Sequence, residues 1–409
     1  MRTPALLMTA VLTAAAVVAC GSGDSAAVTL WMYPVITDQA RSVAFWHRVE
    51  TGFERETGID LDVELQPWAS RQEKLGAALM AGNGPDVVLL QPDMIPQYVG
   101  EKALLPVSDV LAGSKPPFPP RVVEALTVDG QAYGVPLYRT VTTTVYNRKL
   151  FAEAGITDLP RTWDEVKAAA PKLAARGVPV LDYAGSTEET LNLTFYPLLW
   201  QAGGRVFTPD GRKSAFASPE GVAALRFLVD LGRVHGLPPD AATRRSAVAG
   251  DAVATGRAAM AHAMTESAAR GVIAAFGAQN VAIGLPLQDK SRVTFGTPGG
   301  LSLLRRAKNP DAARKLLSYL RSPSVVGELC AESGYFPPWD GSSPPADQVD
   351  QDFAQALPFA SAGDNHPQAR KVMGLLAPHL QAALLGRATP EQALADAAGE
   401  ADALLGSGR

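Results

Sequence analysis

Side chains suited to binding a polar ligand come just after apolar runs that are typical of strands. Tyr33, Asp93 and Glu266 each occupy such a position. In open α/β sheets ligands bind beyond the carboxyl ends of the strands, so we expect these side chains at one binding surface. Flat aromatic faces cover the C–H side of a sugar ring, and carboxylates accept hydrogen bonds from its hydroxyls. The spacing therefore favours a site for a polyhydroxylated ligand.

Tryptophans fall into two groups by their position in the apolar pattern. Trp68 lies between a predicted strand and a predicted helix, outside any apolar period, which favours a stacking surface for a ligand. Trp31, Trp46 and Trp163 sit inside periodic apolar patterns and are expected in the core.

Motifs of known catalytic sites are absent from the sequence. It contains no His-Glu-x-x-His, Gly-x-Ser-x-Gly or P-loop pattern, and its five histidines lack the spacing of metal ligands. The 41 Asp and Glu residues leave an exported glycosidase or lyase open as an alternative, although no pair is marked by its position. We expect a binding protein without a metal or cofactor.

Length and composition indicate two folded lobes. The chain has 409 residues, 47% of them hydrophobic, and a formal net charge of −4. This is too long for one ordinary core and too apolar for a disordered chain, so two α/β lobes are expected. No stripe of Lys and Arg is present, which argues against nucleic acid as a partner. After residue 20 no apolar run is long enough to cross a bilayer.

The N-terminal segment has the features of an export signal. Arg2 precedes the apolar stretch 5–19, and a small residue stands directly before Cys20. The tetrad Val17-Val18-Ala19-Cys20 resembles a bacterial lipobox, which predicts a signal peptide over 1–19 and a lipidated Cys20; an ordinary signal peptide is the alternative. Residues 20–27 would then form the lipidated Cys and a flexible tether. With Cys20 acylated, Cys330 has no partner and no disulfide is expected.

Strands and helices alternate over the first hundred residues, which predicts a parallel sheet. The apolar patterns predict strands at 28–33, 59–65 and 86–90 and helices at 42–57 and 70–81. Further along, Thr162 and Thr389 begin patterns that fit capping boxes, and a Thr-rich strand is expected over 141–145.

A series of short motifs resembles one known family. The chain is similar to the large extracellular solute-binding protein family 1, whose members include maltodextrin, disaccharide and glycerol-phosphodiester receptors of ABC transporters. The matching segments, in order along the chain, are 53–59, 82–88, 129–136, 145–151, 160–165, 256–260, 299–300, 333–337 and 386–394. Each motif is weak alone, and their shared order behind a lipobox-like tetrad carries the resemblance.

The resemblance implies an α/β, two-lobed, type II periplasmic-binding-protein-like fold with a ligand cleft between the lobes. The expected pieces are 28–137 plus 287–334 for lobe 1 and 138–286 plus 335–409 for lobe 2, with hinges near Leu137–Thr140 and Leu285–Pro286. A ligand in the cleft would close the lobes by hinge motion.

The resemblance also implies roles for individual residues. Asp93 matches a carboxylate that binds sugar hydroxyls in maltodextrin receptors, and Arg370 matches a tail arginine of trehalose-type and glycerophosphodiester-type receptors. Glu266 stands where many sugar binders carry a tryptophan, which suggests a smaller or more polar ligand.

Four further positions are implied by the same resemblance. Tyr138 and Thr140 fall at the expected hinge, facing the cleft. Gly300 and Tyr335 match positions that contact ligand in several family members, and a glycine allows close backbone approach.

The sequence thus predicts a monomeric receptor that is lipid-anchored to the outer face of the cytoplasmic membrane. It would capture a mono- or disaccharide and deliver it to the permease subunits of an ABC importer. A glycerol phosphodiester is the alternative ligand, favoured by Arg370 and Tyr335 and disfavoured by the lack of a basic cluster. An exported carbohydrate-active enzyme remains the alternative of another class.

Overall fold

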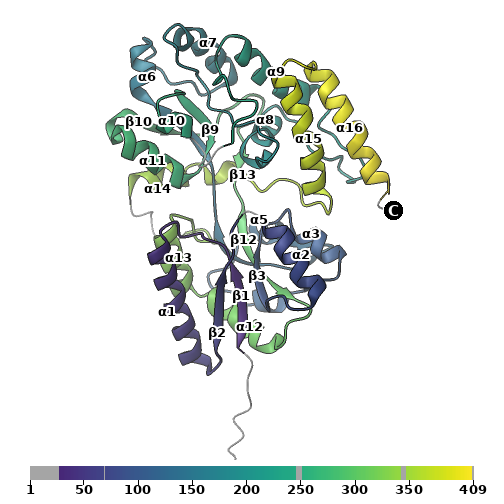
Figure 1. Cartoon of the computed structure of the whole chain (residues 1–409). Helices are drawn as coiled ribbons and strands as arrows, with labels where there is room; N and C mark the ends of the chain where they lie inside the picture. The colour runs from purple at the N-terminus through teal and green to yellow at the C-terminus, as the bar shows by residue number, and fades with distance from the viewer. Residues whose placement is uncertain (1–26, 69, 246–250, 342–346, 408–409) are drawn as a thin grey trace, which may run out of the picture.

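Two α/β lobes make up the molecule. The computed structural model describes residues 27–68, 70–245, 251–341 and 347–407. Figure 1 shows the lobes stacked end to end, with lobe 1 below and lobe 2 above. Each lobe has its own large hydrophobic cluster and a smaller satellite cluster. The predicted two-lobed α/β architecture is confirmed.

Lobe 1 is built on a six-stranded sheet in the order β2-β1-β3-β12-β4, with β7 also paired to β12. Strand β1 is parallel to β2 and β3, whereas β12 is antiparallel to β3, β4 and β7. The carboxyl ends of β1, β2 and β3 therefore lie at one edge of the sheet, toward lobe 2 (Figure 1). The elements of lobe 1 are β1 (Val28–Met32), α1 (Gln39–Thr57), β2 (Leu61–Leu65), α2 (Arg71–Ala81), β3 (Val87–Leu90), α3 (Ile95–Gly100), β4 (Leu104–Leu105), α4 (Ser108–Leu111), α5 (Pro120–Glu124), β5 (Thr127–Val128), β6 (Gln131–Ala132), β7 (Val135–Arg139), β12 (Pro298–Leu304), α12 (Pro310–Leu320) and α13 (Pro323–Ser333).

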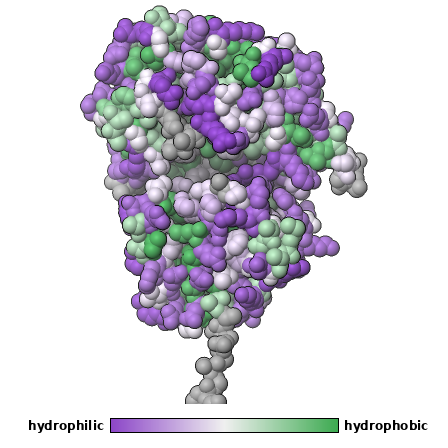
Figure 2. All heavy atoms as spheres, in the orientation of Figure 1, coloured by the Kyte–Doolittle hydropathy of each residue, from purple (hydrophilic) through white to green (hydrophobic). Residues whose placement is uncertain are grey.

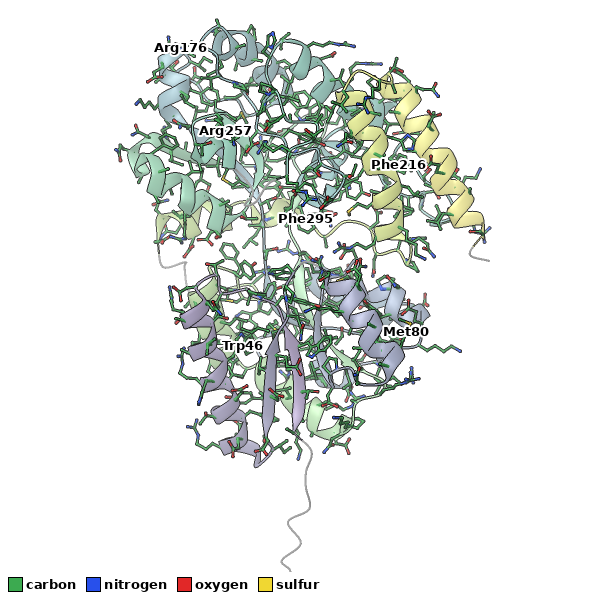
Figure 3. All side chains as sticks on the ribbon, viewed as in Figure 1. Trp46, Met80, Arg176, Phe216, Arg257 and Phe295 are labelled. Carbon is green, nitrogen blue, oxygen red and sulfur yellow. The ribbon has the colours of Figure 1, made fainter. Side chains whose placement is uncertain are left out.

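Local signals place the first elements. All four residues of β3 are buried, as a strand covered on both faces requires. Helix α1 starts three residues before the predicted position because Asp38 caps it, its side chain accepting a hydrogen bond from the backbone N–H of Arg41. It ends at Gly58, whose φ of 69° suits a glycine. Trp46 points from α1 into lobe 1, as predicted (Figure 3).

Lobe 2 contains a three-stranded sheet in the order β10-β8-β9, in which β8 is antiparallel to both neighbours. Helices α15 and α16 pack side by side at the outside of lobe 2, against α9 (Figure 1). Its helices and strands are β8 (Thr143–Asn147), α6 (Arg148–Glu153), α7 (Trp163–Ala174), α8 (Tyr196–Gln201), α9 (Pro219–Arg233), α10 (Asp251–Ala254), β9 (Met260–Met264), α11 (Glu266–Phe276), β10 (Val281–Gly284), β11 (Thr294–Phe295), α14 (Gln348–Ala354), β13 (Ala360–Ser361), α15 (Ala369–Leu384) and α16 (Pro390–Ser407), with 3-10 turns at Leu191–Leu193, Ala278–Asn280 and Leu357–Phe359.

One predicted capping box is complete and the other is half formed. At α7 the Thr162 side chain and the Glu165 carboxylate satisfy each other's backbone N–H groups. Trp163 packs behind this cap, stacked on Phe227 at 4.5 Å between ring centroids. At α16 the Thr389 hydroxyl accepts from the Gln392 N–H, but the Gln392 amide donates forward to Asp396.

The chain passes between the lobes along strands that are hydrogen-bonded to each other. The Thr140 N–H donates to the Thr297 carbonyl at 2.9 Å, and the Thr142 N–H donates to the Phe295 carbonyl at 2.9 Å. Figure 3 shows Phe295 at the level where the lobes meet. The first crossing between the lobes thus lies at Thr140–Thr142, next to the hinge expected near Leu137–Thr140.

The return hinge differs from the predicted Leu285–Pro286. Leu287 is fully buried in the core of lobe 2, and the Gln288 N–H donates to the Arg161 carbonyl of that lobe. The chain therefore stays in lobe 2 until Gly296, and the second piece of lobe 1 begins near Pro298.

After α13 the chain crosses between the lobes once more, and Arg139 holds this segment in place. The buried Arg139 guanidinium donates to the carbonyls of Pro337 and Trp339, each at 2.9 Å, and pairs with Asp340 at 2.9 Å. Trp339 packs into the core of lobe 1. The lobe 1 segment thus extends beyond residue 334, where the sequence placed its end.

Candidate ligand-binding site

Aromatic side chains line the upper edge of lobe 1. Tyr33 directly follows β1, and Trp68 follows β2; their rings stack with centroids 4.7 Å apart and an interplanar angle of 24°. The Trp68 indole N–H donates to the Pro34 carbonyl at 3.3 Å, which orients the ring. Both residues stand where the carboxyl ends of parallel strands place them.

A second aromatic pair lies beside the first. Tyr138 of β7 and Tyr335, just after α13, have ring centroids 4.8 Å apart. A Cβ at Gly299 would come within 2.3 Å of the Tyr138 ring, so a glycine is required behind it. Burial raises the pKa of Tyr335 to about 12 and raises that of Tyr138 as well, with Tyr33 near enough to add to the latter. We call Tyr33, Trp68, Tyr138 and Tyr335 the aromatic floor.

Asp93 and Arg370 join the two lobes. Asp93 follows β3 in lobe 1, and Arg370 extends from the first turn of α15 in lobe 2. The Arg370 Nε lies 2.7 Å from Oδ2 of Asp93, which is only 8% exposed. The contact is an ion pair outside hydrogen-bond geometry, and neither oxygen of Asp93 accepts a hydrogen bond. The sequence predicted both residues for the site, and the structure brings them together.

Arg71 and Gln91 complete this cluster. The guanidinium of Arg71, the first residue of α2, donates to the Trp68 carbonyl at 3.2 Å and to Oε1 of Gln91 at 3.1 Å. Arg370 donates to the same Gln91 oxygen at 3.3 Å. Burial lowers the pKa of Arg71, and the positive charge of Arg370 lowers it further. Arg71 was not predicted, because a charged residue in the first turn of a helix is indistinguishable in sequence from a solvated one.

Lobe 2 adds an aromatic side of its own. The Tyr196 hydroxyl is buried without a hydrogen-bond partner, and its ring centroid lies 6.0 Å from that of Trp200. Burial raises the pKa of Tyr196, and the charges of Asp364 and Asp93 raise it further. Burial also raises the pKa of Asp364, against a hydrogen bond from the Val206 N–H. Tyr196, Trp200 and Asp364 were not predicted for the site.

Two residues predicted for the site, Thr140 and Gly300, make contacts within the protein. Thr140 is part of the hinge, where its hydroxyl lies 3.2 Å from the Thr297 carbonyl. Gly300 packs inside lobe 1, where a Cβ would lie 2.7 Å from the Leu126 side chain. Its small size is therefore required by packing inside lobe 1.

Glu266 takes part in an ion-pair network. It pairs with Arg270, which also binds Asp347, the N-cap of α14, and Asp350 within α14. Its carboxylate lies so close to Gly334 that a Cβ there would collide with it. Glu266 thus contacts lobe 1 near Tyr335, with its charge already matched by Arg270.

A separate groove lies in lobe 2, away from these residues. It has a volume of about 1090 Å³ and is lined by the ends of α7, α9 and α15, including His235, Arg257 and Arg387. It contains none of the residues predicted for the site. Figure 2 shows a predominantly hydrophilic surface over both lobes.

The described residues include neither a metal-type cluster nor a membrane-spanning helix. Among them, no group of three or more His, Cys, Asp or Glu side chains is arranged to hold a metal ion. No helix in the described ranges has the length and hydropathy needed to cross a bilayer. Cys330, on α13, is buried and free.

Comparison with known proteins identifies the family. The model of the bacterial extracellular solute-binding protein family matches residues 31–326. The chain belongs to this family. Members are binding proteins, and the family match agrees with the two-lobed architecture. The resemblance inferred from the motifs is confirmed.

Relatives in the family match this chain over part or most of its length. A putative binding protein of Brucella abortus is 24% identical over 387 residues, covering 90% of this chain and 91% of its own. The diacetylchitobiose binding protein DasA of Streptomyces coelicolor is 33% identical over 113 residues, 28% of this chain and 27% of its own. An ABC transporter solute binding protein of Thermotoga lettingae, solved with α-D-tagatose, is 27% identical with a TM-score of 0.79, covering 93% of this chain and 99% of that one.

Proposed function

We propose that this protein is the receptor of an ABC importer that captures a small carbohydrate, a mono- or disaccharide, and delivers it to a membrane permease. The observation that carries the proposal is the Asp93–Arg370 pair, which joins the lobes at the edge of the aromatic floor. Relatives named for diacetylchitobiose and a structure solved with tagatose support a carbohydrate as the ligand class.

The chemistry of these side chains suits a sugar. Tyr33 and Tyr138 of the aromatic floor are buried in this arrangement of the lobes, and flat aromatic rings are the groups that cover the C–H face of a sugar ring. Asp93 accepts hydrogen bonds from hydroxyls, and Arg370 donates to hydroxyl oxygens. Because the two charged groups come from different lobes, a ligand that contacts both would stabilise the closed arrangement.

Export and anchoring are part of the proposal. The tetrad Val17-Val18-Ala19-Cys20 lies outside the described residues. A lipid on Cys20 would hold the receptor at the outer face of the cytoplasmic membrane, with the tether to residue 27 leaving the lobes free. We infer a monomer that binds its ligand without changing it chemically.

One observation supports a glycerol phosphodiester as the alternative ligand. Arg71 lies beside Arg370, so a pair of cationic groups is present where the sequence showed no basic cluster. Such a pair of positive charges would favour a ligand with a negative charge.

A thermal-shift screen of the whole chain over mono- and disaccharides tests the proposal. A true ligand at 100 times its dissociation constant stabilises the folded state by about 2.7 kcal/mol, which raises the melting temperature measurably. The same ligand should have a much smaller effect on Arg370→Gln. If no carbohydrate shifts the wild type, the proposed ligand class is wrong.

A further inference from the structure

Two guanidinium groups converge on one neutral oxygen in the site. Arg71 of lobe 1 and Arg370 of lobe 2 both donate to Oε1 of Gln91, at 3.1 and 3.3 Å. An amide oxygen accepts these hydrogen bonds but cancels no charge. Like charges held this close in a partly buried site repel each other, so an arrangement of this kind calls for an anion.

Asp93 matches only one of the two cations. Its carboxylate lies 2.7 Å from the Nε of Arg370. At Arg71, the repulsion from Arg370 outweighs the attraction to Asp93. Asp93 supplies the strongest of the interactions that favour the charged form of Arg71.

The other contacts of Arg71 are neutral. One nitrogen donates to the Trp68 carbonyl at 3.2 Å, and the guanidinium carbon lies 5.4 Å from the centroid of the Trp68 ring. Its Nε is buried and has no acceptor. Burying a charged group in neutral surroundings is costly, and an N–H without an acceptor adds to that cost.

Neighbouring carboxylates are matched elsewhere. Asp364 lies near Arg205, whose charge partly offsets its burial. Glu266 pairs with Arg270, on the far side of the aromatic floor. The surplus positive charge therefore stays at Arg71 and Arg370.

We propose that the ligand of this receptor carries an anionic group, a carboxylate or a phosphate, which binds between Arg71 and Arg370. This inference rests on the proposed function and refines its ligand class to an acidic sugar or another small polyol with an anionic substituent. The sugar hydroxyls would be bound by Asp93 and the carbon face by the aromatic floor.

The geometry of guanidinium groups suits such a ligand. Carboxylate and phosphate oxygens match the paired N–H donors of arginine, and the resulting charge-assisted hydrogen bonds are stronger than those to a hydroxyl. An anion between the two arginines would also replace their repulsion by two attractions. A neutral sugar of the same skeleton leaves the repulsion in place.

Calorimetry on the whole chain with matched ligand pairs tests this inference. The pairs are D-glucose with D-glucuronate and D-galactose with D-galacturonate, with D-glucose 6-phosphate and a glycerol phosphodiester as phosphate probes. We expect an acidic member to bind about tenfold or more tightly than its neutral counterpart, the difference made by one charge-assisted contact. The preference should shrink as NaCl rises from about 0.05 to 0.5 M. The strongest probe then tells a carboxylate from a phosphate ligand.

Variants of Arg71 make the assignment specific. Arg71→Gln should abolish the preference for the anion over its neutral counterpart, because it removes the charge and keeps hydrogen-bond donors. Arg71→Lys should retain part of the preference, since it keeps the charge without the fork. Arg55→Gln, at the exposed end of α1, is the matched control and should behave as wild type.

Each outcome of this experiment is informative. Tighter or equal binding of the neutral sugar overturns the inference and leaves the sugar receptor intact. A preference for the anion that survives in Arg71→Gln, with an unchanged melting temperature, removes Arg71 from the site. Binding of the glycerol phosphodiester but of no sugar supports an anionic ligand and contradicts the proposed carbohydrate. Binding of none of the probes contradicts both proposals.

Discussion

The Asp93 carboxylate has hydrogen-bonding capacity that a ligand could use. It is buried and paired with Arg370, yet neither of its oxygens accepts a hydrogen bond. A carboxylate in this state has lost its hydration without regaining equivalent bonds, so hydroxyl donors from a ligand would be bound favourably.

The substitution Asp93→Asn tests this role. It removes the charged acceptor for hydroxyls, so binding of a neutral sugar should weaken by about 1.5–3 kcal/mol, the range for a hydrogen bond to a charged group. An anionic sugar loses the same acceptor but is freed from a repulsive neighbour, so the ratio of acid to neutral affinity should rise. Calorimetry with one matched pair measures both. Neutral-sugar binding equal to wild type or tighter would remove Asp93 from the site.

Sequence position alone located part of the site. Tyr33, Trp68 and Asp93 follow strands of a parallel sheet, and this rule brings them to one edge without knowledge of the tertiary structure. Arg71 could not be found this way, because its burial depends on Trp68, Gln91 and a helix almost three hundred residues away. Gly300 was assigned to the ligand, but its contact with Leu126 shows a packing role.

At the scale of elements, local patterns predicted β1, β2, β3, α1 and α2 closely. Continuous apolar runs and capping residues act within a few residues of chain, so they are visible in sequence. The return hinge was misplaced because it depends on distant pairing. Strand β11 pairs with β13, and Leu287 is buried among helices of lobe 2.

Strand β9 carries a buried histidine that predicts a pH dependence. His262 is 3% exposed, its Nε2 lies 2.8 Å from the Thr194 carbonyl, and burial lowers its pKa to about 4. Between that value and the ordinary pKa of about 6.5, the unfolded chain binds the proton and the folded protein does not. Stability should therefore fall as the pH is lowered through this window, by up to roughly 3 kcal/mol.

Replacing the histidine separates this effect from other titrations. His262→Gln keeps a donor for the Thr194 carbonyl but does not titrate, so its stability should fall less between pH 6.5 and pH 4. Urea unfolding at several pH values measures the difference. Parallel pH profiles for the two proteins would show that His262 does not govern acid sensitivity.

For the whole molecule, the two-lobed architecture is what the composition and motif order predicted, whereas the return hinge lies further along the chain. Contacts between the lobes occur on both sides of the aromatic floor, at Arg370 with Asp93 and at Glu266 with Gly334. The Asn365 amide adds a 2.7 Å hydrogen bond to the Thr127 carbonyl. These contacts between distant segments define the site and could not be derived from local sequence.

If Cys20 carries the proposed lipid anchor, membrane attachment and ligand binding should separate in a single variant. Cys20→Ser should move the protein from the membrane fraction to the soluble fraction, because the acylated thiol is lost. Ligand affinity should stay within about twofold, since the tether proposed for residues 20–27 would separate the lipid from lobe 1. Fractionation and calorimetry on the same variant check both expectations. Wild-type protein that is already freely soluble with an unacylated N-terminus would contradict the anchor.

A small carbohydrate that binds between the lobes, as proposed, should be released unchanged. Titration calorimetry of the whole chain with the best sugar from the screen, followed by mass analysis of the recovered ligand, tests it most directly. We predict one site per chain, an affinity of about 1 μM or tighter, equivalent to roughly −8 kcal/mol, and an unaltered ligand. Absence of saturable binding by every neutral and acidic sugar, or recovery of a cleaved product, would contradict the account.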